Sequence, residues 1–268
     1  MRLSIRHQTV YRYSGPVAYS IQQLRLTPRL EGQQRVASWQ IDTPGQCHAY
    51  ADAYGNLSRM MTTNDAHEGM TILAHGVVDT GAIVGGRLDN VESLSPLVFT
   101  VPTRLTEPTT AINALAAACL PQGQATTAQL ICLAEHIIGA VQYQTGATMV
   151  TTSADDALRL GRGVCQDHAH LFLACCHARG IAARYVSGYI DPETTSHAAS
   201  HAWIDAWTSD ADFTGWVSID VTHARPMTPA YVRLAIGRDY DGAAPIRGVR
   251  RGGGDETMQV SVTIAVLP

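Results

Sequence analysis

The sequence predicts an α+β protein with an N-terminal antiparallel β domain, which we expect to be sandwich-like, and a core in which helices pack on an antiparallel sheet. Three observations lead to this prediction. Residues 1–95 alternate polar and apolar side chains with the two-residue period of strands. From residue 108 the apolar side chains recur with the helical period, and strand-like patterns return after Gly180. We therefore place the two domains at 1–95 and 96–268.

The composition excludes several classes of protein. A chain of 268 residues, 46% of them hydrophobic, can bury one or two cores. Its net charge of -4 and scattered basic residues predict no nucleic-acid partner. No apolar run reaches the length of about 20 residues that a membrane span requires, and from the first residues we expect no signal peptide. Six cysteines are too few for a disulfide scaffold, so we expect a cytoplasmic protein with free thiols.

In the first domain, residues 3–13 form the longest run of strict alternation, and Gly15-Pro16 predicts a turn after it. The run over residues 19–26 changes phase, which predicts a β-bulge at Gln22-Gln23. The other strands expected here are Ala49–Ala53, Leu57–Thr62 and Ile72–Val78, with Tyr54-Gly55-Asn56 as a hairpin turn. A sandwich or a small barrel would bury one face of these strands.

The second domain begins with helix signals. Thr126 and Gln129 form a capping-box pattern that starts a helix, and residues 108–120 predict a shorter helix before it. Another helix starts at Ser153 and ends at Gly161, which suits a left-handed cap. The strands expected after the next helix are Ile181–Ile190, His201–Trp207, Trp216–Val221 and Met258–Val266, the last of which could pair with either domain.

The helix that starts at Cys165 places a thiol in a reactive setting. Gly161 and Gly163 stop the preceding helix, so Cys165 lies at the beginning of the next one. There the unpaired backbone N–H groups and the helix dipole favour a negative charge, and we expect them to lower the pKa of the thiol. Ala169 and Cys176 share the stripe of Cys165, together with Phe172, which predicts that this face packs on a sheet.

A thiolate nucleophile needs a base and a group that orients the base. His201 and Asp220 lie on consecutive predicted strands. If the two residues face each other in an antiparallel hairpin, the turn is centred between residues 210 and 211, inside the polar stretch 208–214. The position of the turn therefore predicts that His201 and Asp220 are neighbours, and Cys165, His201 and Asp220 become a candidate catalytic triad.

The order of these residues resembles the transglutaminase-like superfamily, which has a papain-like core. Segments similar to the motifs of bacterial members are Gly163–His170, Gly180–Tyr189, Ser200–Trp203, Ile219–Thr222 and Gly237–Tyr240. The β-rich N-terminal region resembles that of the two-domain bacterial subgroup, so the resemblance covers nearly the whole chain. The sequence departs from the usual pattern at His168, where the family has an aromatic residue, at Val221, where it has proline, and at His223, where asparagine is common.

The resemblance implies a cysteine-nucleophile amide hydrolase or acyltransferase that acts on peptide or isopeptide bonds through a thioester, with protease-like hydrolysis favoured over cross-linking. The backbone N–H of Cys165 would stabilise the oxyanion. Tyr143 is a candidate side-chain donor, and Gln166 and Trp203 are further candidates for oxyanion or substrate binding. The implied partner is a peptide or protein, without a cofactor or a metal. The alternative is a non-catalytic module that binds polypeptides in the same cleft.

Other roles for these side chains are weaker. A zinc site is the rival interpretation of Cys165, His168, His170, Cys175, Cys176 and His177. Helix geometry argues against it, because His168 and His170 are about 200° apart around the helix. We expect His168 to be partly exposed and non-catalytic. We also expect Asp167 to pair with His170 and Arg238 with Asp239.

All 19 basic residues are arginine, and the chain has no lysine. The protein therefore cannot be cross-linked through lysine side chains of its own. If it transfers acyl groups to amines, the acceptor must come from another molecule. The sequence leaves the oligomeric state open.

Overall fold

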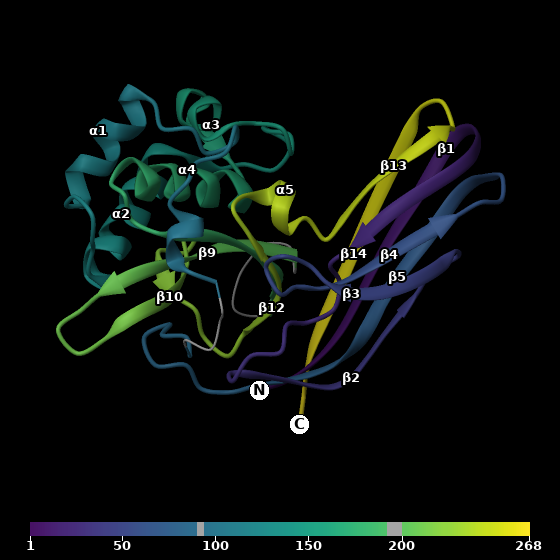
Figure 1. The fold of residues 1–268 in the computed structure, drawn as a ribbon, viewed down its shortest axis with the longest axis horizontal. Coiled ribbons are helices and arrows are strands. Elements are labelled where there is room, and N and C mark those ends of the chain that lie inside the picture. Colours follow the sequence, from purple (N-terminus) through teal and green to yellow (C-terminus); the bar gives the residue numbers. More distant parts are fainter. Residues whose placement is uncertain (90–93, 192–199) are drawn as a thin grey trace.

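A computed structural model describes residues 1–89, 94–191 and 200–268. It contains a seven-stranded antiparallel sheet, a five-stranded antiparallel sheet and a layer of helices on the second sheet (Figure 1). The helices and the five-stranded sheet lie together, and the long strands of the first sheet extend away from them. Within the described residues, no helix is both long and apolar enough to cross a membrane.

The seven-stranded sheet is built around β1, with the order β2-β5-β1-β4-β3. Along one edge of β1, β5 pairs with its first part and β4 with its last part. Along the opposite edge, β14 pairs with the first part and β13 with the last part. The sequence predicted a sandwich or a small barrel; the strands form one half-barrel sheet with its own apolar cluster. Its strands are β1 (Arg2–Leu24), β2 (Gln34–Asp42), β3 (Gln46–Ala51), β4 (Leu57–Thr63), β5 (His67–Thr80), β13 (Ile246–Gly252) and β14 (Glu256–Leu267).

The path of β1 differs from the prediction. The strand continues through Gly15-Pro16, so the predicted turn is wrong, and pairing with β4 is uninterrupted at Gln22-Gln23, so the predicted bulge is wrong as well. The register with β13 shifts instead between Val17 and Tyr19. The buried side chains have odd numbers through Val17 and even numbers from Ser20. One extra residue between Val17 and Ser20 turns the following side chains to the other face of the strand. This explains the phase change seen in the sequence.

The C-terminal strand, for which the sequence left two partners open, belongs to the first sheet. Leu3 pairs with Val266 and Tyr13 with Glu256, so β14 runs along most of β1. The chain therefore starts in this sheet, builds the second domain and returns to complete the first. The two ends of the chain lie near each other (Figure 1).

The second domain has the sheet order β11-β10-β9-β8-β12. The capping box of Thr126 and Gln129 is confirmed, and Gly161 has the left-handed φ of 68° expected of a helix end. Its helices are η1 (Pro96–Phe99), α1 (Thr110–Cys119), α2 (Thr127–Ala140), α3 (Ala154–Leu160), α4 (Cys165–Ala178) and α5 (Tyr240–Ala243). Its strands are β6 (Gln142–Tyr143), β7 (Arg162–Gly163), β8 (Ala183–Ile190), β9 (Ser200–Ser209), β10 (Thr214–Asp220), β11 (Arg225–Pro226) and β12 (Tyr231–Gly237).

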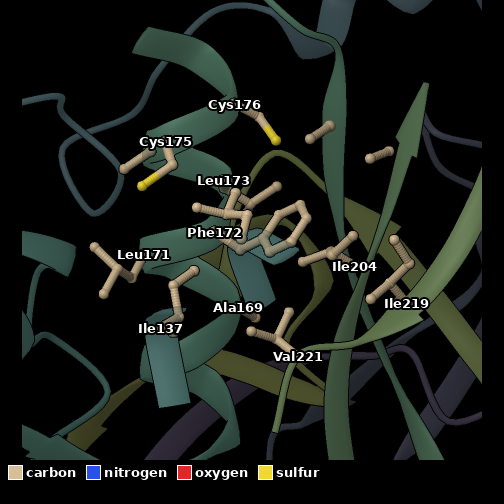
Figure 2. Packing of buried hydrophobic residues seen from close by; sticks show 14 of the residues in the cluster. Ile137, Ala169, Leu171, Phe172, Leu173, Cys175, Cys176, Ile204, Ile219 and Val221 are labelled. Atoms are coloured by element: carbon tan, nitrogen blue, oxygen red, sulfur yellow. The ribbon is translucent and has the colours of Figure 1, made fainter. Parts of the chain in front are cut away.

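The helix α4 is the centre of this domain. Every side chain from Asp167 to His177 is buried. Ala169, Phe172 and Cys176 lie in one apolar cluster with residues of β9 and β10, so the predicted stripe is confirmed. Figure 2 shows Phe172 directed toward Ile204 and the neighbouring strand. Burial of one such aromatic or aliphatic side chain contributes about 1.5–3 kcal/mol, which fixes the helix firmly on the sheet.

A buried ionic network joins the two domains. The carboxylate of Asp205 on β9 accepts hydrogen bonds from Arg233 Nη1 at 2.8 Å and Nη2 at 2.6 Å, and from Arg184 Nε at 2.8 Å. Arg233 Nε also lies 2.6 Å from the carboxylate of Glu31, which comes from the first domain and pairs with Arg29. Burial raises the pKa of Asp205, but the two guanidinium groups outweigh it and hold this pKa well below its usual range.

The network indicates why arginine is needed at position 233. The planar guanidinium of Arg233 donates two hydrogen bonds to the Asp205 carboxylate and lies against that of Glu31, whereas an ammonium group is a compact charge without that fork. We predict that Arg233→Lys lowers the free energy of unfolding by about 3 kcal/mol, because the buried carboxylates of Asp205 and Glu31 lose part of the positive partner that balances their charge.

Chemical denaturation measures this change. The matched control is Arg35→Lys at the exposed pair with Asp79, where we expect a change within about 0.5 kcal/mol. Equal losses in the two variants would contradict the role given to the buried network.

Candidate active site

Cys165 is the first residue of α4, as predicted, and the loop before it is closely held. Asp167 Oδ2 accepts hydrogen bonds from the backbone N–H of Val164 at 2.7 Å and from Thr148 Oγ1 at 2.6 Å. A Cβ atom on Gly163 would lie 2.6 Å from the same carboxylate oxygen, so only glycine fits there. Burial raises the pKa of Asp167, and these two hydrogen bonds oppose the increase. The start of the helix is thus fixed where the thiol emerges.

His201 and Asp220 form a buried pair. His201 Nε2 lies 2.8 Å from Asp220 Oδ2, and both side chains are almost completely inaccessible to water. Two further donors reach the same oxygen: His223 Nδ1 at 2.6 Å and the Tyr231 hydroxyl at 2.6 Å. Burial raises the pKa of Asp220, but His201 and His223 outweigh it and hold this pKa well below its usual range. The carboxylate is therefore ionised.

The other neighbour of His201 is Cys165. Burial lowers the pKa of His201, but the charge of Asp220 and the interaction with Cys165 outweigh this effect and raise the pKa to about 10. Because Nε2 contacts Asp220, Nδ1 is the ring nitrogen available to the thiol. The fold thus places the imidazole of His201 between the thiol of Cys165 and the carboxylate of Asp220. At neutral pH the imidazole favours its protonated form.

The predicted contact between His201 and Asp220 is found, but the predicted strand register is wrong. Ile219 pairs with Ile204 and Trp216 with Trp207, so the hairpin is centred one residue later than expected. His201 and Asp220 consequently lie two residues out of direct register. Since side chains alternate between the faces of a strand, a shift of two residues keeps both on the same face as diagonal neighbours.

The three weaker candidates have different positions. Tyr143 is close to the nucleophile: burial and the charge of Cys165 raise the pKa of its hydroxyl to about 12, so it remains a donor. Gln166 Nε2 donates to the backbone carbonyl of Val150 at 3.2 Å and holds the preceding loop. Trp203 is fully buried and is a packing residue of the site: its ring stacks on His201 with centroids 6.1 Å apart.

His168 is buried, so the expectation of a partly exposed side chain is wrong. Its Nε2 lies 2.9 Å from the Val141 carbonyl and its Nδ1 lies 3.1 Å from Thr222 Oγ1. Both nitrogens have partners, and the ring is therefore unsuited to act as a rival base. This imidazole instead ties α4 to the segment that follows Asp220.

Two other expected pairs are replaced by different contacts. His170 Nε2 accepts a hydrogen bond from the backbone N–H of Tyr240 at 3.1 Å, while the carboxylate of Asp167 holds the start of α4. Arg238 donates to the carbonyl of Pro102 at 2.8 Å, and Asp239 caps α5. The partners of His170 and Arg238 are backbone groups distant in the sequence, which spacing along the chain does not reveal.

The sequence prediction missed His223 and Tyr231 as partners of Asp220. His223 was noted as a departure from the family pattern, and its position three residues after Asp220 is the signal that could have found it. Tyr231 begins a strand that had not been predicted.

Two groups in the described part of the chain have donor atoms close enough to hold a metal ion: Cys119, Cys132 and His136, and separately His201, Asp220 and His223. In the second group the two imidazoles are hydrogen-bonded to the carboxylate, so protons fill the position that a cation would need. That arrangement suits acid–base chemistry better than metal binding.

Comparisons with known proteins agree with this architecture. Residues 3–79 match the bacterial transglutaminase-like N-terminal region, and residues 113–221 match the transglutaminase-like superfamily. An uncharacterized protein of Mycobacterium leprae (strain TN) is 32% identical, with 99% of each chain covered. One from Mycobacterium tuberculosis (strain ATCC 25618 / H37Rv) is 29% identical and covers 100% of this chain and 93% of its own.

Among solved structures, the fold is similar to that of "a Putative Cysteine Protease from Cytophaga hutchinsonii". The TM-score is 0.78 at 22% sequence identity, and the similarity covers 100% of this chain and 91% of the other. It therefore includes both domains and not the helical core alone.

The charge of Asp220 predicts how His201 titrates. We expect Asp220→Asn to lower the pKa of His201 from about 10 toward or below its ordinary value of about 6.5. Burial lowers this pKa, and the variant removes the carboxylate charge that raises it. Since folding raises this pKa in the wild type, the pair stabilises the fold fully below the ordinary value, and the contribution is lost as the pH rises through about 10.

NMR titration of the ring, assigned with His201→Gln, measures the pKa. Tyr231→Phe is the matched control, because it removes one hydrogen bond to Asp220 and leaves the carboxylate charge. A shift in Asp220→Asn no larger than in this control would contradict the electrostatic role of the carboxylate.

Proposed function

The chain belongs to the transglutaminase-like superfamily, and on that premise we propose that Cys165, His201 and Asp220 are the catalytic triad of a cysteine-based amide hydrolase. The observation that carries the proposal is the buried His201–Asp220 pair beside a thiol at the start of a helix. In a catalytic triad an ionised carboxylate orients the imidazole and stabilises the imidazolium, and the charge and position of Asp220 fit that role.

The reaction follows from these positions. The thiolate of Cys165 attacks the carbonyl carbon of an amide, and the carbonyl π electrons move to the oxygen. The backbone N–H of Cys165 donates to that oxyanion, and the Tyr143 hydroxyl is the side-chain donor we propose beside it. When the C–N bond breaks, His201 gives its proton to the amine, and a thioester on Cys165 remains.

Water completes the cycle. His201, now neutral, takes a proton from a water molecule as its oxygen attacks the thioester, and the thiolate leaves as the carboxylic acid forms. Asp220 keeps the ring oriented and stabilises its charge in both steps. An external amine in place of water would give acyl transfer instead. We propose hydrolysis as the main outcome, and the fold shared with a protein named as a cysteine protease supports this choice.

A peptide or protein is the substrate that the surroundings favour. A pocket of about 150 Å³ lies between the two domains and includes Ser200, the residue before His201. Its walls come from both sheets: His7, Thr9, Tyr11, Ser200, Tyr240, Pro245, Ile246, Met258 and Val260. Met258 and Val260 are largely exposed and apolar, so this pocket suits an apolar side chain of a polypeptide.

Selective alkylation separates an enzyme from a binding module that has only kept the cleft. We predict that iodoacetamide at pH 6 labels Cys165 on the order of 100-fold faster than Cys47, because the protonated imidazole of His201 stabilises the thiolate form of Cys165. Mass spectrometry of proteolytic peptides locates the label.

His201→Ala should remove most of this difference, since the thiolate loses its imidazolium partner. The control variant His48→Ala changes an exposed histidine on β3 and should leave the labelling rates unchanged. If Cys165 reacts no faster than Cys47 in the folded protein, the chain is a binding module and not a thiol enzyme.

A further inference from the structure

A second cluster of thiols lies at the contact between α1 and α2, outside the proposed catalytic site. Cys119 is the last residue of α1, and Cys132 and His136 are one turn apart on α2. Cys119 Sγ lies 3.1 Å from Cys132 Sγ and 3.2 Å from His136 Nδ1, and Cys132 Sγ lies 3.7 Å from the same nitrogen. The two cysteines are partly exposed and the histidine is exposed, so ions from solution can reach them.

We propose that Cys119, Cys132 and His136 bind a zinc ion, with water as the fourth ligand. The centre of a triangle with these three sides lies about 2 Å from each donor atom, so an ion slightly above that plane has ordinary Zn–N and Zn–S distances of about 2.0–2.3 Å. Two thiolates and one imidazole are a ligand set that zinc prefers, and the exposed side leaves room for the water.

The scaffold that presents the cluster is rigid. Cys132 and His136 are separated by four residues, which places both on one face of α2. Leu120 follows Cys119 and is buried, as are Leu133 and Ile137 beside the two α2 ligands. The ligands therefore extend from backbone that is anchored in the core, and binding requires little movement of the chain.

Binding exchanges protons for the ion. His136 Nδ1 also lies 2.8 Å from the Cys132 carbonyl and can donate a proton to it in the metal-free protein. When zinc binds, the ring proton resides on Nε2, and Nδ1 supplies its lone pair to the ion. The two thiols release their protons to water, so one Zn²⁺ replaces two H⁺ and no oxidation occurs.

A disulfide is the rival interpretation of two adjacent thiols. It would require the sulfur atoms to approach from 3.1 Å to about 2.05 Å, and it would also require an external oxidant that accepts two electrons. It gives no role to His136. Zinc uses all three side chains, with the two sulfur atoms moving apart from 3.1 Å to the wider spacing of tetrahedral ligands. It would link α1 to α2, both of which contact α4, the helix that carries Cys165.

The proposal can be tested on the full-length protein, reduced and freed of metal with a chelator. We expect zinc titration to show one site per chain, and cobalt(II) to give the thiolate charge-transfer absorption of a cysteine-ligated metal. Cys119→Ser, Cys132→Ser and His136→Gln should each weaken zinc binding by about 100-fold or more, since loss of an outer-shell partner alone costs about 10- to 100-fold.

Three control variants exclude other sites. Cys47→Ser and His48→Gln change a thiol and an imidazole on the first sheet, and Cys165→Ala removes the proposed nucleophile; all three should keep wild-type zinc affinity. The proposal is wrong if the reduced protein binds no zinc, or if binding is lost in Cys165→Ala and kept in the cluster variants. A Cys119–Cys132 disulfide together with absence of zinc binding after reduction would also overturn it.

Discussion

The structure of the candidate site depends on the buried carboxylate of Asp220. One of its oxygens accepts hydrogen bonds from His201, His223 and Tyr231, which come from three different parts of the second domain. A buried charge is tolerated only where such partners compensate it, so the carboxylate holds these side chains together. The orientation of His201, and through it the environment of Cys165, follows from that single requirement.

The same strands connect the site to the rest of the protein. His201 and Asp205 are both on β9, and Tyr231 and Arg233 are both on β12. The ionic network that joins Asp205 to Arg233 and Glu31 thus fixes the two strands that carry partners of Asp220, and it attaches them to the N-terminal domain. A buried guanidinium is the group that can make both sets of contacts, which gives the arginine at this position a structural reason.

Much of the site could be predicted from the sequence, because its signals are local. The glycines before Cys165 and the turn between His201 and Asp220 identify a helix start and a hairpin. The register differs by two residues from the predicted one, but this shift leaves both side chains on the same face of the sheet, so the predicted contact still forms. The contacts of Trp203 and His168 could not be predicted in the same way. Whether such a side chain is buried depends on strands and loops that are distant in the sequence, as does the pairing of β14 with β1.

The most direct test of the proposed function is to trap the acyl group on the enzyme. After incubation with an activated ester of a short peptide and a rapid acid quench, the intact protein is weighed by mass spectrometry. We expect one acyl group on Cys165, released by hydroxylamine and lost as the free acid when no amine is added. An adduct that forms equally well in Cys165→Ala, or no adduct in the wild type, would contradict it.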